Sequence, residues 1–507
     1  MVRLAPASAH ATRSEVPTRA PAGPASSGLL GFCARHFTWL ALFVLCLAAV
    51  NSFYRLGDEA VRQWDESLYA VSALEAVRNG QWIGITFRGE TDYYNTKPPL
   101  NVWLIAFSFR AFGVSLVSLR LVSAASAWLT VAVLLVWARR TLGPAVALFS
   151  GLVLSTTFGF FYVHSGRTAN TDPLFTLLVV LTVVTLSASS QRAWRLVWLG
   201  PILAAVFLLR GMGVVMPVLI VALAELSRRQ RSRDRVAALA VGLLVGLVPV
   251  AWWVWARWQF DEWRFLERLF HYDFVARTVR QLEGHRRGSL YYLNILWKYG
   301  YEWLAAAALA LLVVPVSWSR VREALPPWRR SASLGPVMVA WAAASLLLPT
   351  VMRTKVSWYL NPFYPLFAVG VAVVLVHAFS RARDRPRASL RLGALAAIVV
   401  VAVVAAEARL AWNSVRRRAL VHSEQSLLLG ARDELGGRRV FHDRRNHATY
   451  FVGAGLVGAT LVEAVDPTTF LRDSAPGDYY LTSQAVADAR LVVMRSTRRH
   501  WLYRRRE

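Results

Sequence analysis

Long apolar stretches with few charged residues alternate with short polar segments along most of the chain. Each stretch is about 15–22 residues long, and a helix of about 20 apolar residues can cross the hydrocarbon core of a bilayer. The pattern therefore predicts an all-α polytopic membrane protein with about 11 transmembrane helices. The expected spans lie near residues 37–54, 119–138, 143–163, 172–190, 195–209, 211–226, 236–256, 302–318, 334–351, 356–378 and 392–410.

The fifth and sixth expected spans are short and are separated by Arg210, so one long helix is an alternative. Loop charge distinguishes the two interpretations, because Lys and Arg concentrate on the cytoplasmic side of membrane proteins. With the N-terminus inside, two separate spans keep every arginine cluster on the cytoplasmic side, whereas one merged span would reverse the later clusters. The clusters are Arg139 and Arg140; Arg192 and Arg195; Arg228, Arg229, Arg231, Arg233 and Arg235; Arg320, Arg322, Arg329 and Arg330; and Arg381, Arg383, Arg385, Arg387 and Arg391.

This topology divides the chain into three parts. Residues 1–36 are rich in Ala, Pro, Ser and Arg and are expected to form a disordered cytoplasmic tail. Residues 37–410 form the membrane domain, with large outer loops at 55–118 and 257–301. Residues 411–507 lie on the outer face.

The segment 411–507 is predicted to form a small extracytoplasmic α/β domain, with a partly ordered tail as the alternative. Asp466-Pro467 is typical of a helix start. Helix-like stretches alternate with extended apolar pieces, which are Arg439–His442, Thr460–Val465, Tyr479–Thr482 and Leu491–Met494.

The formal net charge of +28 could indicate nucleic-acid binding, but the arginines lie in short loops between spans. That distribution is what membrane topology requires, so no nucleic-acid partner is expected. The basic residues are mostly arginine, which is consistent with a GC-rich bacterial genome. The protein is therefore expected in a bacterial inner membrane.

Candidate chemistry begins in the first outer loop. Asp65 and Glu66 are adjacent carboxylates at the mouth of a membrane helix, where charges are costly unless they face water or a partner. A carboxylate in that place can accept a proton from an attacking hydroxyl. Lys97 precedes two prolines and is a rigidly placed cation suited to a phosphate. A solvated loop is the alternative for each residue taken alone.

Two later segments are also expected on the outer face. In the segment 164–174, Arg167 and Asp172 could form an ion pair, or Asp172 could cap the helix that begins before Pro173. In the segment 353–365, cations lie beside Trp and Tyr residues. Interfacial anchoring accounts for these aromatic residues better than it accounts for Lys355.

Together and in this order, these segments resemble the integral-membrane glycosyltransferases of the GT-C class. The closest resemblance is to bacterial aminoarabinose transferases and protein O-mannosyltransferases, and it covers about residues 38–380. The matching elements are Asp65-Glu66-x-x-Tyr69, Lys97-Pro98-Pro99-Leu100, Arg167 through Pro173, and Lys355 through Pro365.

The resemblance implies a GT-C fold and a polyprenyl-phosphate sugar, such as an undecaprenyl-phosphate sugar, as donor. Asp65 would be the general base, and Asp172 would help to shape or polarise the acceptor site. Lys97 would hold the lipid phosphate, with help from Arg353 and Lys355. Attack opposite the departing phosphate would invert the anomeric configuration.

The resemblance also assigns a substrate pocket and leaves the acceptor open. Glu66, Tyr69, Arg167 and Tyr359 would line the pocket. The acceptor would be lipid A, another glycolipid or a protein on the outer face. The rival hypotheses are a lipid or sugar transporter or flippase of the envelope, and a non-catalytic scaffold with the same fold.

No cofactor is certain from the sequence. Aminoarabinose transferases often carry an acidic residue before the lysine of the Lys-Pro-Pro element, where it can help to bind a metal, but this chain has Thr96 there. A divalent metal ion remains one option in the second outer loop. The candidate ligands are His271, Asp273, Glu283 and His285.

Overall fold

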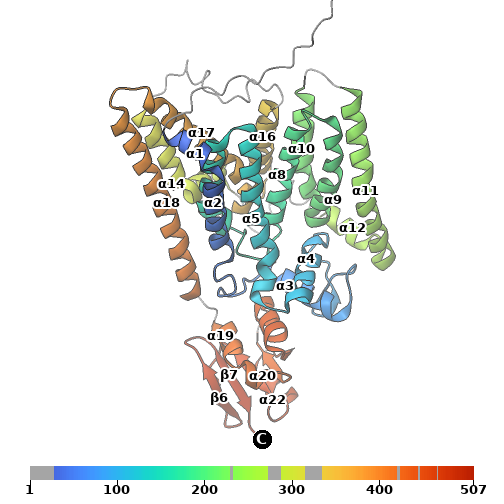
Figure 1. Cartoon of the computed structure of the whole chain (residues 1–507). Coiled ribbons are helices and arrows are strands. Elements are labelled where there is room, and N and C mark those ends of the chain that lie inside the picture. The colour runs from blue at the N-terminus through green and yellow to red at the C-terminus, as the bar shows by residue number, and fades with distance from the viewer. Residues whose placement is uncertain are drawn as a thin grey trace, which may run out of the picture.

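The computed structural model describes residues 28–228, 232–271, 287–314, 334–419, 423–443, 446–464 and 466–507. Most of the described chain is helical, and Figure 1 shows a bundle of long helices with the C-terminal segment gathered at one end. The helices up to the end of the bundle are α1 (Leu29–Arg35), α2 (Phe37–Phe53), α3 (Asp65–Asn79), α4 (Leu100–Phe112), α5 (Leu116–Thr141), α6 (Pro144–Thr156), α7 (Phe158–Tyr162), α8 (Asp172–Ala188), η1 (Ala193–Trp198), α9 (Leu199–Arg210), η2 (Gly211–Val214), α10 (Val215–Leu226), α11 (Arg233–Asp261), α12 (Arg264–Arg268), α14 (Tyr291–Val313), α16 (Leu334–Val351), η5 (Ser357–Phe363), α17 (Tyr364–Arg383) and α18 (Ala388–Ala419).

Within the described residues, 6 helical runs are long and apolar enough to cross a membrane. The pair α1 and α2, bent by 86°, would add a seventh if it acts as one span, and α4, α6 and α8 are shorter apolar helices. These features confirm a mostly helical, multi-pass membrane protein. The figure of 11 spans stays a prediction.

The run from Ala193 to Leu226 reverses its direction at Gly211. At its start, the Arg195 side chain donates to the Ala188 carbonyl at the C-terminal end of α8. At the end of α9, Arg210 instead reaches Asp172, the first residue of α8. The chain therefore travels the length of α8 within η1 and α9.

Helix α10 runs back in the opposite direction. Its Glu225 binds Arg235, whose guanidinium also donates to the carbonyl of Ser189, back at the C-terminal end of α8. Helices α9 and α10 consequently run in opposite directions, as the loop-charge argument requires. Gly211 permits the reversal because its φ is +53° and a Cβ there would lie 3.0 Å from the Leu269 side chain.

Close glycine packing joins α9 to α11. The carbonyl of Gly242 lies where a Cβ on Gly200 would have to be, at 1.7 Å from it. Small residues let two helix backbones approach in this way, which favours helix association in a bilayer. The contact fixes α9, and with it Arg210, against the long helix α11.

The outer loop 55–118 forms ordered structure. It contains α3, a hairpin of β1 (Thr86–Phe87) and β2 (Glu90–Thr91), and α4. Helix α3 is buried at every position from Glu66 to Ala76, not on one face alone. The reason is that α4 packs on α3 from one side and the C-terminal segment contacts it from another.

The C-terminal segment contains a five-stranded sheet of order β4-β3-β5-β7-β6. Its β3–β4 and β3–β5 pairs are parallel, and its β5–β7 and β6–β7 pairs are antiparallel. The strands are β3 (Arg439–His442), β4 (Thr460–Glu463), β5 (Tyr479–Thr482), β6 (Leu491–Ser496) and β7 (Trp501–Arg505). The helices are α19 (Ser423–Gly430), α20 (Arg432–Leu435), α21 (His447–Tyr450), η6 (Phe451–Val457) and α22 (Pro467–Asp473).

The sequence located four of these strands and missed β7. Asp466 caps α22 as its position before Pro467 indicates, because its carboxylate accepts a hydrogen bond from the Thr469 amide at 2.8 Å. The sheet is therefore present where it was expected. That residues 411–507 form a separate domain stays a prediction.

Two helices extend far beyond the expected spans. Helix α18 continues past residue 410 to Ala419, and α14 begins at Tyr291 inside the expected outer loop 257–301. Both extensions carry polar and charged residues, which hydropathy excludes from a span but a helix projecting beyond the bilayer tolerates. Residues 1–27 of the expected tail lie outside the described part, and α1 occupies most of the rest of it.

Candidate functional site

Three segments that are distant in the chain meet around Asp65, the first residue of α3. Lys97 Nζ lies 3.8 Å from Asp65 Oδ1, and His164 Nδ1 lies 3.7 Å from Asp65 Oδ2. The Asp65 side chain is 35% exposed, so water and a substrate can reach it. The structure thus brings Asp65 and Lys97 of the first outer loop together with the segment 164–174. We call Asp65, Lys97, His164, Asp172 and Arg210 the polar cluster.

The start of α3 is held in an unusual conformation. Trp64, the residue before Asp65, has φ 72° and ψ −122°, which is rare for a residue with a side chain. Asp65 and Glu66 occupy the first helical turn, where the helix dipole favours negative charge. The backbone conformation of Trp64 sets the position of Asp65 at the N-terminus of α3, and the helix dipole favours its negative charge there.

Lys97 lies between the β1–β2 hairpin and α4. Pro99 is the N-cap residue of α4, so the two prolines end the extended segment and start the helix. The ammonium lies 5.4 Å from the centre of the Tyr69 ring, within range of a cation–π contact. Burial raises the pKa of Tyr69, partly offset by Lys97, so this phenol stays protonated at neutral pH.

Asp172 forms an ion pair with Arg210, not with Arg167. Arg210 Nη1 lies 2.5 Å from Asp172 Oδ1, and both side chains are largely buried. The guanidinium also lies 5.5 Å from the Tyr359 ring centre and 5.1 Å from that of Phe175. Asp172 makes no side-chain cap on α8, so the capping alternative is also wrong.

Sequence reasoning treated Arg210 only as a break between two spans. An arginine at an outer-face turn between apolar helices was the available signal, because a charge in that place needs a partner. His164 and Trp358 lie in the segments 164–174 and 353–365, and neither was assigned a role from the sequence. In the structure their rings stack, with centres 3.7 Å apart and an angle of 16° between planes.

Arg167 is buried and holds the segment that follows α2. Its guanidinium donates to the carbonyls of Asn51, Tyr54 and Arg55 and lies 3.3 Å from Glu59. Because backbone carbonyls need partners when buried, these bonds stabilise the path of the chain towards Asp65. A direct role of Arg167 in a substrate pocket stays a prediction.

Glu66 is also buried, 2% exposed, beside Asp65. Its carboxylate accepts hydrogen bonds from Arg120 Nε at 2.7 Å, the Arg62 amide at 2.8 Å and the Ala169 amide at 3.1 Å. These bonds lower its pKa against the effect of burial. Glu66 thus joins three segments that surround the polar cluster, and its assignment to the pocket stays a prediction.

The two cations of the segment 353–365, Arg353 and Lys355, lie differently. Arg353 is exposed, whereas Lys355 is buried and its Nζ donates to the Met352 carbonyl at 2.6 Å. In the described part of the chain, no measured contact links either residue to Asp65. Their role in phosphate binding stays a prediction, while Tyr359 does approach the cluster through Arg210.

No group of three His, Cys, Asp or Glu side chains within the described residues could hold a metal ion. Of the four candidate ligands, only His271 is described, and Asp273, Glu283 and His285 lie outside the described residues. The metal hypothesis is therefore tested only in part.

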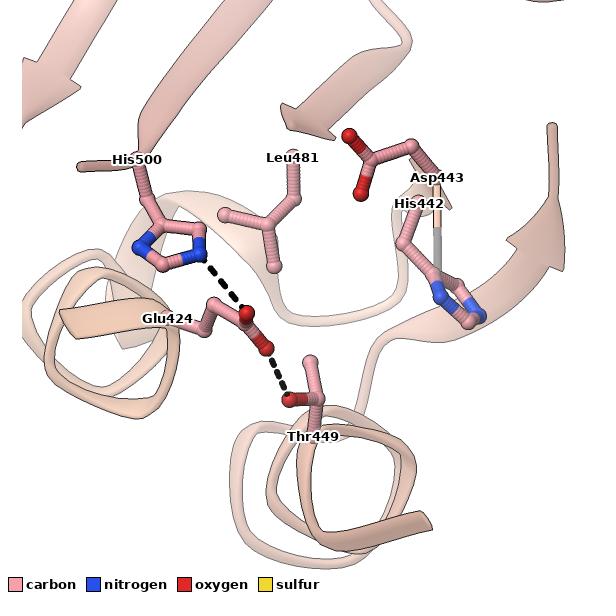
Figure 2. A pocket seen from close by; sticks show the side chains of 6 residues that line it. All are labelled: Glu424, His442, Asp443, Thr449, Leu481 and His500. Atoms are coloured by element: carbon pink, nitrogen blue, oxygen red, sulfur yellow. Dashed lines mark hydrogen bonds and ion pairs between the residues drawn. The ribbon is translucent and has the colours of Figure 1, made fainter. Parts of the chain in front are cut away.

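A small cavity lies in the C-terminal segment, between the sheet and its helices (Figure 2). Its volume is about 10 Å³, room for roughly one water molecule. Glu424 spans it, accepting from the Thr449 hydroxyl at 2.7 Å and lying 2.7 Å from His500 Nε2 (Figure 2). The cavity is too small for a sugar.

Comparison with known proteins agrees with this architecture. The family model for dolichyl-phosphate-mannose-protein mannosyltransferase matches residues 96–255. An undecaprenyl phosphate-alpha-4-amino-4-deoxy-L-arabinose arabinosyl transferase of Pseudomonas fluorescens is 27% identical over 422 residues, covering 81% of this chain and 68% of its own. An uncharacterized protein of Aquifex aeolicus is 27% identical over 339 residues, covering 65% of this chain and 63% of its own.

Solved structures show the same fold. ArnT from Cupriavidus metallidurans, bound to undecaprenyl phosphate, superimposes with a TM-score of 0.68 at 17% identity, over 92% of this chain and 98% of that one. The oligosaccharyltransferase AglB from Archaeoglobus fulgidus gives 0.52 at 11% identity, over 88% and 70%. The chain therefore has the fold of the GT-C membrane glycosyltransferases, and it resembles the aminoarabinose transferases.

Proposed function

We propose that the protein transfers a sugar from a polyprenyl phosphate, such as undecaprenyl phosphate, to an acceptor outside the cytoplasm, with inversion. The observation that carries this proposal is that Lys97 Nζ and His164 Nδ1 both lie within 3.8 Å of the Asp65 carboxylate. The named relatives support the donor, because their names contain undecaprenyl phosphate-linked aminoarabinose and one solved structure holds undecaprenyl phosphate.

Asp65 acts as the general base. Its carboxylate takes the proton from an acceptor hydroxyl as the oxygen attacks the anomeric carbon. The bond from that carbon to the lipid phosphate breaks on the opposite face, so the configuration inverts. A partly exposed carboxylate held at the start of a helix fits this role.

Lys97 binds the phosphate of the donor and stabilises the charge that develops as it leaves. The ammonium is on a flexible stem and lies 3.8 Å from Asp65. When it turns from Asp65 to a phosphate, the carboxylate loses its cation and becomes a better proton acceptor. Donor binding would therefore activate the base. Arg353 and Lys355 would add positive charge along the path of the lipid phosphate.

Asp172 and Tyr359 complete the substrate site through Arg210. The ion pair holds the guanidinium beside the Tyr359 ring, at 5.5 Å from its centre. A fixed guanidinium suits the hydroxyls of a sugar or a second phosphate oxygen. Asp172 thereby shapes the acceptor side of the site, with Tyr69 on the wall near Lys97.

The reaction takes place at the extracytoplasmic face of the inner membrane. The polar cluster lies at one end of α5 and α8, whereas Arg139 and Arg195 lie at the other ends of these helices. Lys and Arg concentrate on the cytoplasmic side, so the cluster faces outward. The acceptor is then lipid A, another envelope glycolipid or a protein. The comparisons give no support to the transporter alternative.

Transfer from a panel of radiolabelled polyprenyl-phosphate sugars to host membranes tests the proposal. We expect wild type to move label and Asp65→Asn to be slower by at least about 10²-fold, since general bases contribute that much. Glu90→Gln is the matched control, because Glu90 is an exposed carboxylate in the neighbouring hairpin. Equal transfer by Asp65→Asn and wild type would exclude Asp65 as the base. No transfer from any donor would exclude the function.

A further inference from the structure

His164 lies in the polar cluster in a conformation that its backbone disfavours. It lies between α7 and α8 with φ 48°, a region that residues with side chains seldom adopt. Such conformations are unfavourable and gather at functional sites, where the surroundings enforce them. The fold therefore holds the His164 backbone in an unfavourable conformation, and this conformation places the imidazole ring beside Asp65.

The imidazole ring is held by stacking and not by a hydrogen bond at Nδ1. It lies parallel to the Trp358 ring of η5, with 3.7 Å between ring centres. Within the described residues, Nδ1 is buried and makes no hydrogen bond, and it lies 3.7 Å from Asp65 Oδ2. A buried polar nitrogen without a hydrogen-bond partner is uncommon and calls for an explanation.

We propose that His164 is a positioning residue and proton relay for Asp65, accepting at Nδ1 the proton that Asp65 takes from the acceptor. The inference rests on the proposed function, because it assigns a second step to the same base. The distance of 3.7 Å exceeds a hydrogen bond, but catalytic hydrogen bonds are often long before substrate is bound. A small rotation of the Asp65 carboxylate closes the gap.

The relay balances as two transfers. In the first, the acceptor O–H bond breaks, its proton goes to Asp65, the new glycosidic bond forms, and the electron pair of the old bond leaves on the lipid phosphate. In the second, the proton moves from Asp65 Oδ2 to His164 Nδ1, which leaves a carboxylate beside an imidazolium. The ring then releases a proton to water, which reaches it because 28% of the side chain is exposed.

The charges around the ring agree with a neutral imidazole at rest. Asp65 from α3 and Asp172 from α8 favour the protonated ring, whereas Arg62 and Lys97 disfavour it. Burial is the largest influence, and the net result is a pKa of His164 below its usual value of 6.5. The ring is therefore neutral at neutral pH and able to accept a proton.

Chemical rescue of His164→Gly tests the relay. Glycine adopts φ 48° without strain, and its missing ring leaves space against Trp358 for added imidazole. We expect kcat for a hydroxyl acceptor to fall about 10²-fold and to recover in part with imidazole. In wild type, kcat/KM should fall as the pH drops through the pKa of His164. This decline should vanish in the variant and return, at the higher pKa of free imidazole, when imidazole is added.

Three comparisons make the outcomes decisive. His377→Gln changes a histidine of α17 away from the cluster and should behave as wild type. If His164→Gly retains wild-type kcat and pH dependence while Asp65→Asn is inactive, the relay is wrong and the proposed function stands. Loss of activity that imidazole does not restore in folded protein would reduce His164 to a structural residue. If wild type itself transfers no sugar, the proposed function fails instead.

Discussion

Asp172 at the start of α8 and Arg210 at the end of α9 form an ion pair, with 2.5 Å between Oδ1 and Nη1. The side chains are 5% and 15% exposed. The pair joins two helices that meet in the polar cluster. Since buried charges must be paired, it is both a structural link and the support for a guanidinium beside Tyr359.

Removing one member of this pair should destabilise the protein. For Arg210→Gln or Asp172→Asn alone we expect a loss of about 3–5 kcal/mol, because the remaining charge is left buried without its partner. The double variant should recover much of the stability but not the transferase activity. Thermal unfolding in detergent measures the first effect and sugar transfer the second. Arg490→Gln removes an exposed arginine beside Asp488 and should leave both unchanged.

Lys97→Ala should weaken use of the donor more than Arg353→Ala. Lys97 lies beside Asp65, whereas Arg353 is exposed and has no measured contact with the cluster in the described part of the chain. We expect kcat/KM for the donor to fall about 10²-fold in Lys97→Ala, the size of effect seen when one charge-stabilising group is lost. Donor titration at fixed acceptor provides the measurement. An equal or larger effect of Arg353→Ala would indicate that the phosphate binds nearer to the segment 353–365.

Glu66 should contribute stability that depends on pH. Its pKa is lowered in the folded protein, mainly through Arg120, although burial opposes the shift. A group with a lowered folded pKa stabilises above its unfolded pKa, here 4.5, and loses that contribution as the pH falls further. Glu66→Gln should thus unfold at a lower temperature than wild type at pH 7.

The difference between Glu66→Gln and wild type should narrow as the pH is lowered below about 4.5. The comparison removes the effect of other carboxyl groups, because both proteins share them. A difference that stays constant from pH 7 to pH 3.5 would show that the bond geometry of Glu66, and not its charge, stabilises the fold.

The C-terminal segment should support catalysis by holding the chain just before Asp65. Gln425 of α19 accepts from the Val61 amide and donates to the Val61 carbonyl, both at 2.9 Å. The Ala448 amide donates to Gln63 at 3.2 Å. Gln425→Ala leaves two buried backbone groups without partners, at a cost of about 1–3 kcal/mol each. We expect a lower kcat with donor KM little changed.

Gln484→Ala is the matched control for this prediction, because Gln484 is an exposed glutamine of the same segment. Steady-state transfer assays on both variants, with thermal unfolding alongside, separate an effect at Asp65 from general loss of fold. Unchanged kcat in Gln425→Ala would show that the path of residues 61–64 does not depend on the C-terminal segment.

The sequence predicted the kind of fold because its main signals are local. A bilayer requires about 20 apolar residues per helix, so spans are visible as uncharged stretches. Arginine clusters in alternate loops predicted two separate spans on either side of Arg210. Asp466-Pro467 indicated the start of α22. Strand β7 was missed because Arg504 and Arg505 end its apolar run, and its pairing with β5 and β6 is not a local signal.

The sequence also indicated Asp65, Lys97 and Asp172 as candidate site residues, because charged side chains at the mouth of a membrane helix are costly unless they face water or a partner. It did not identify their partners. Arg210, His164 and Trp358 join them only after α9 turns back at Gly211 and η5 packs beside α8. Whether a carboxylate is a base or half of a buried ion pair depends on which atoms lie within 4 Å, and that distance is set by helix packing across the whole bundle.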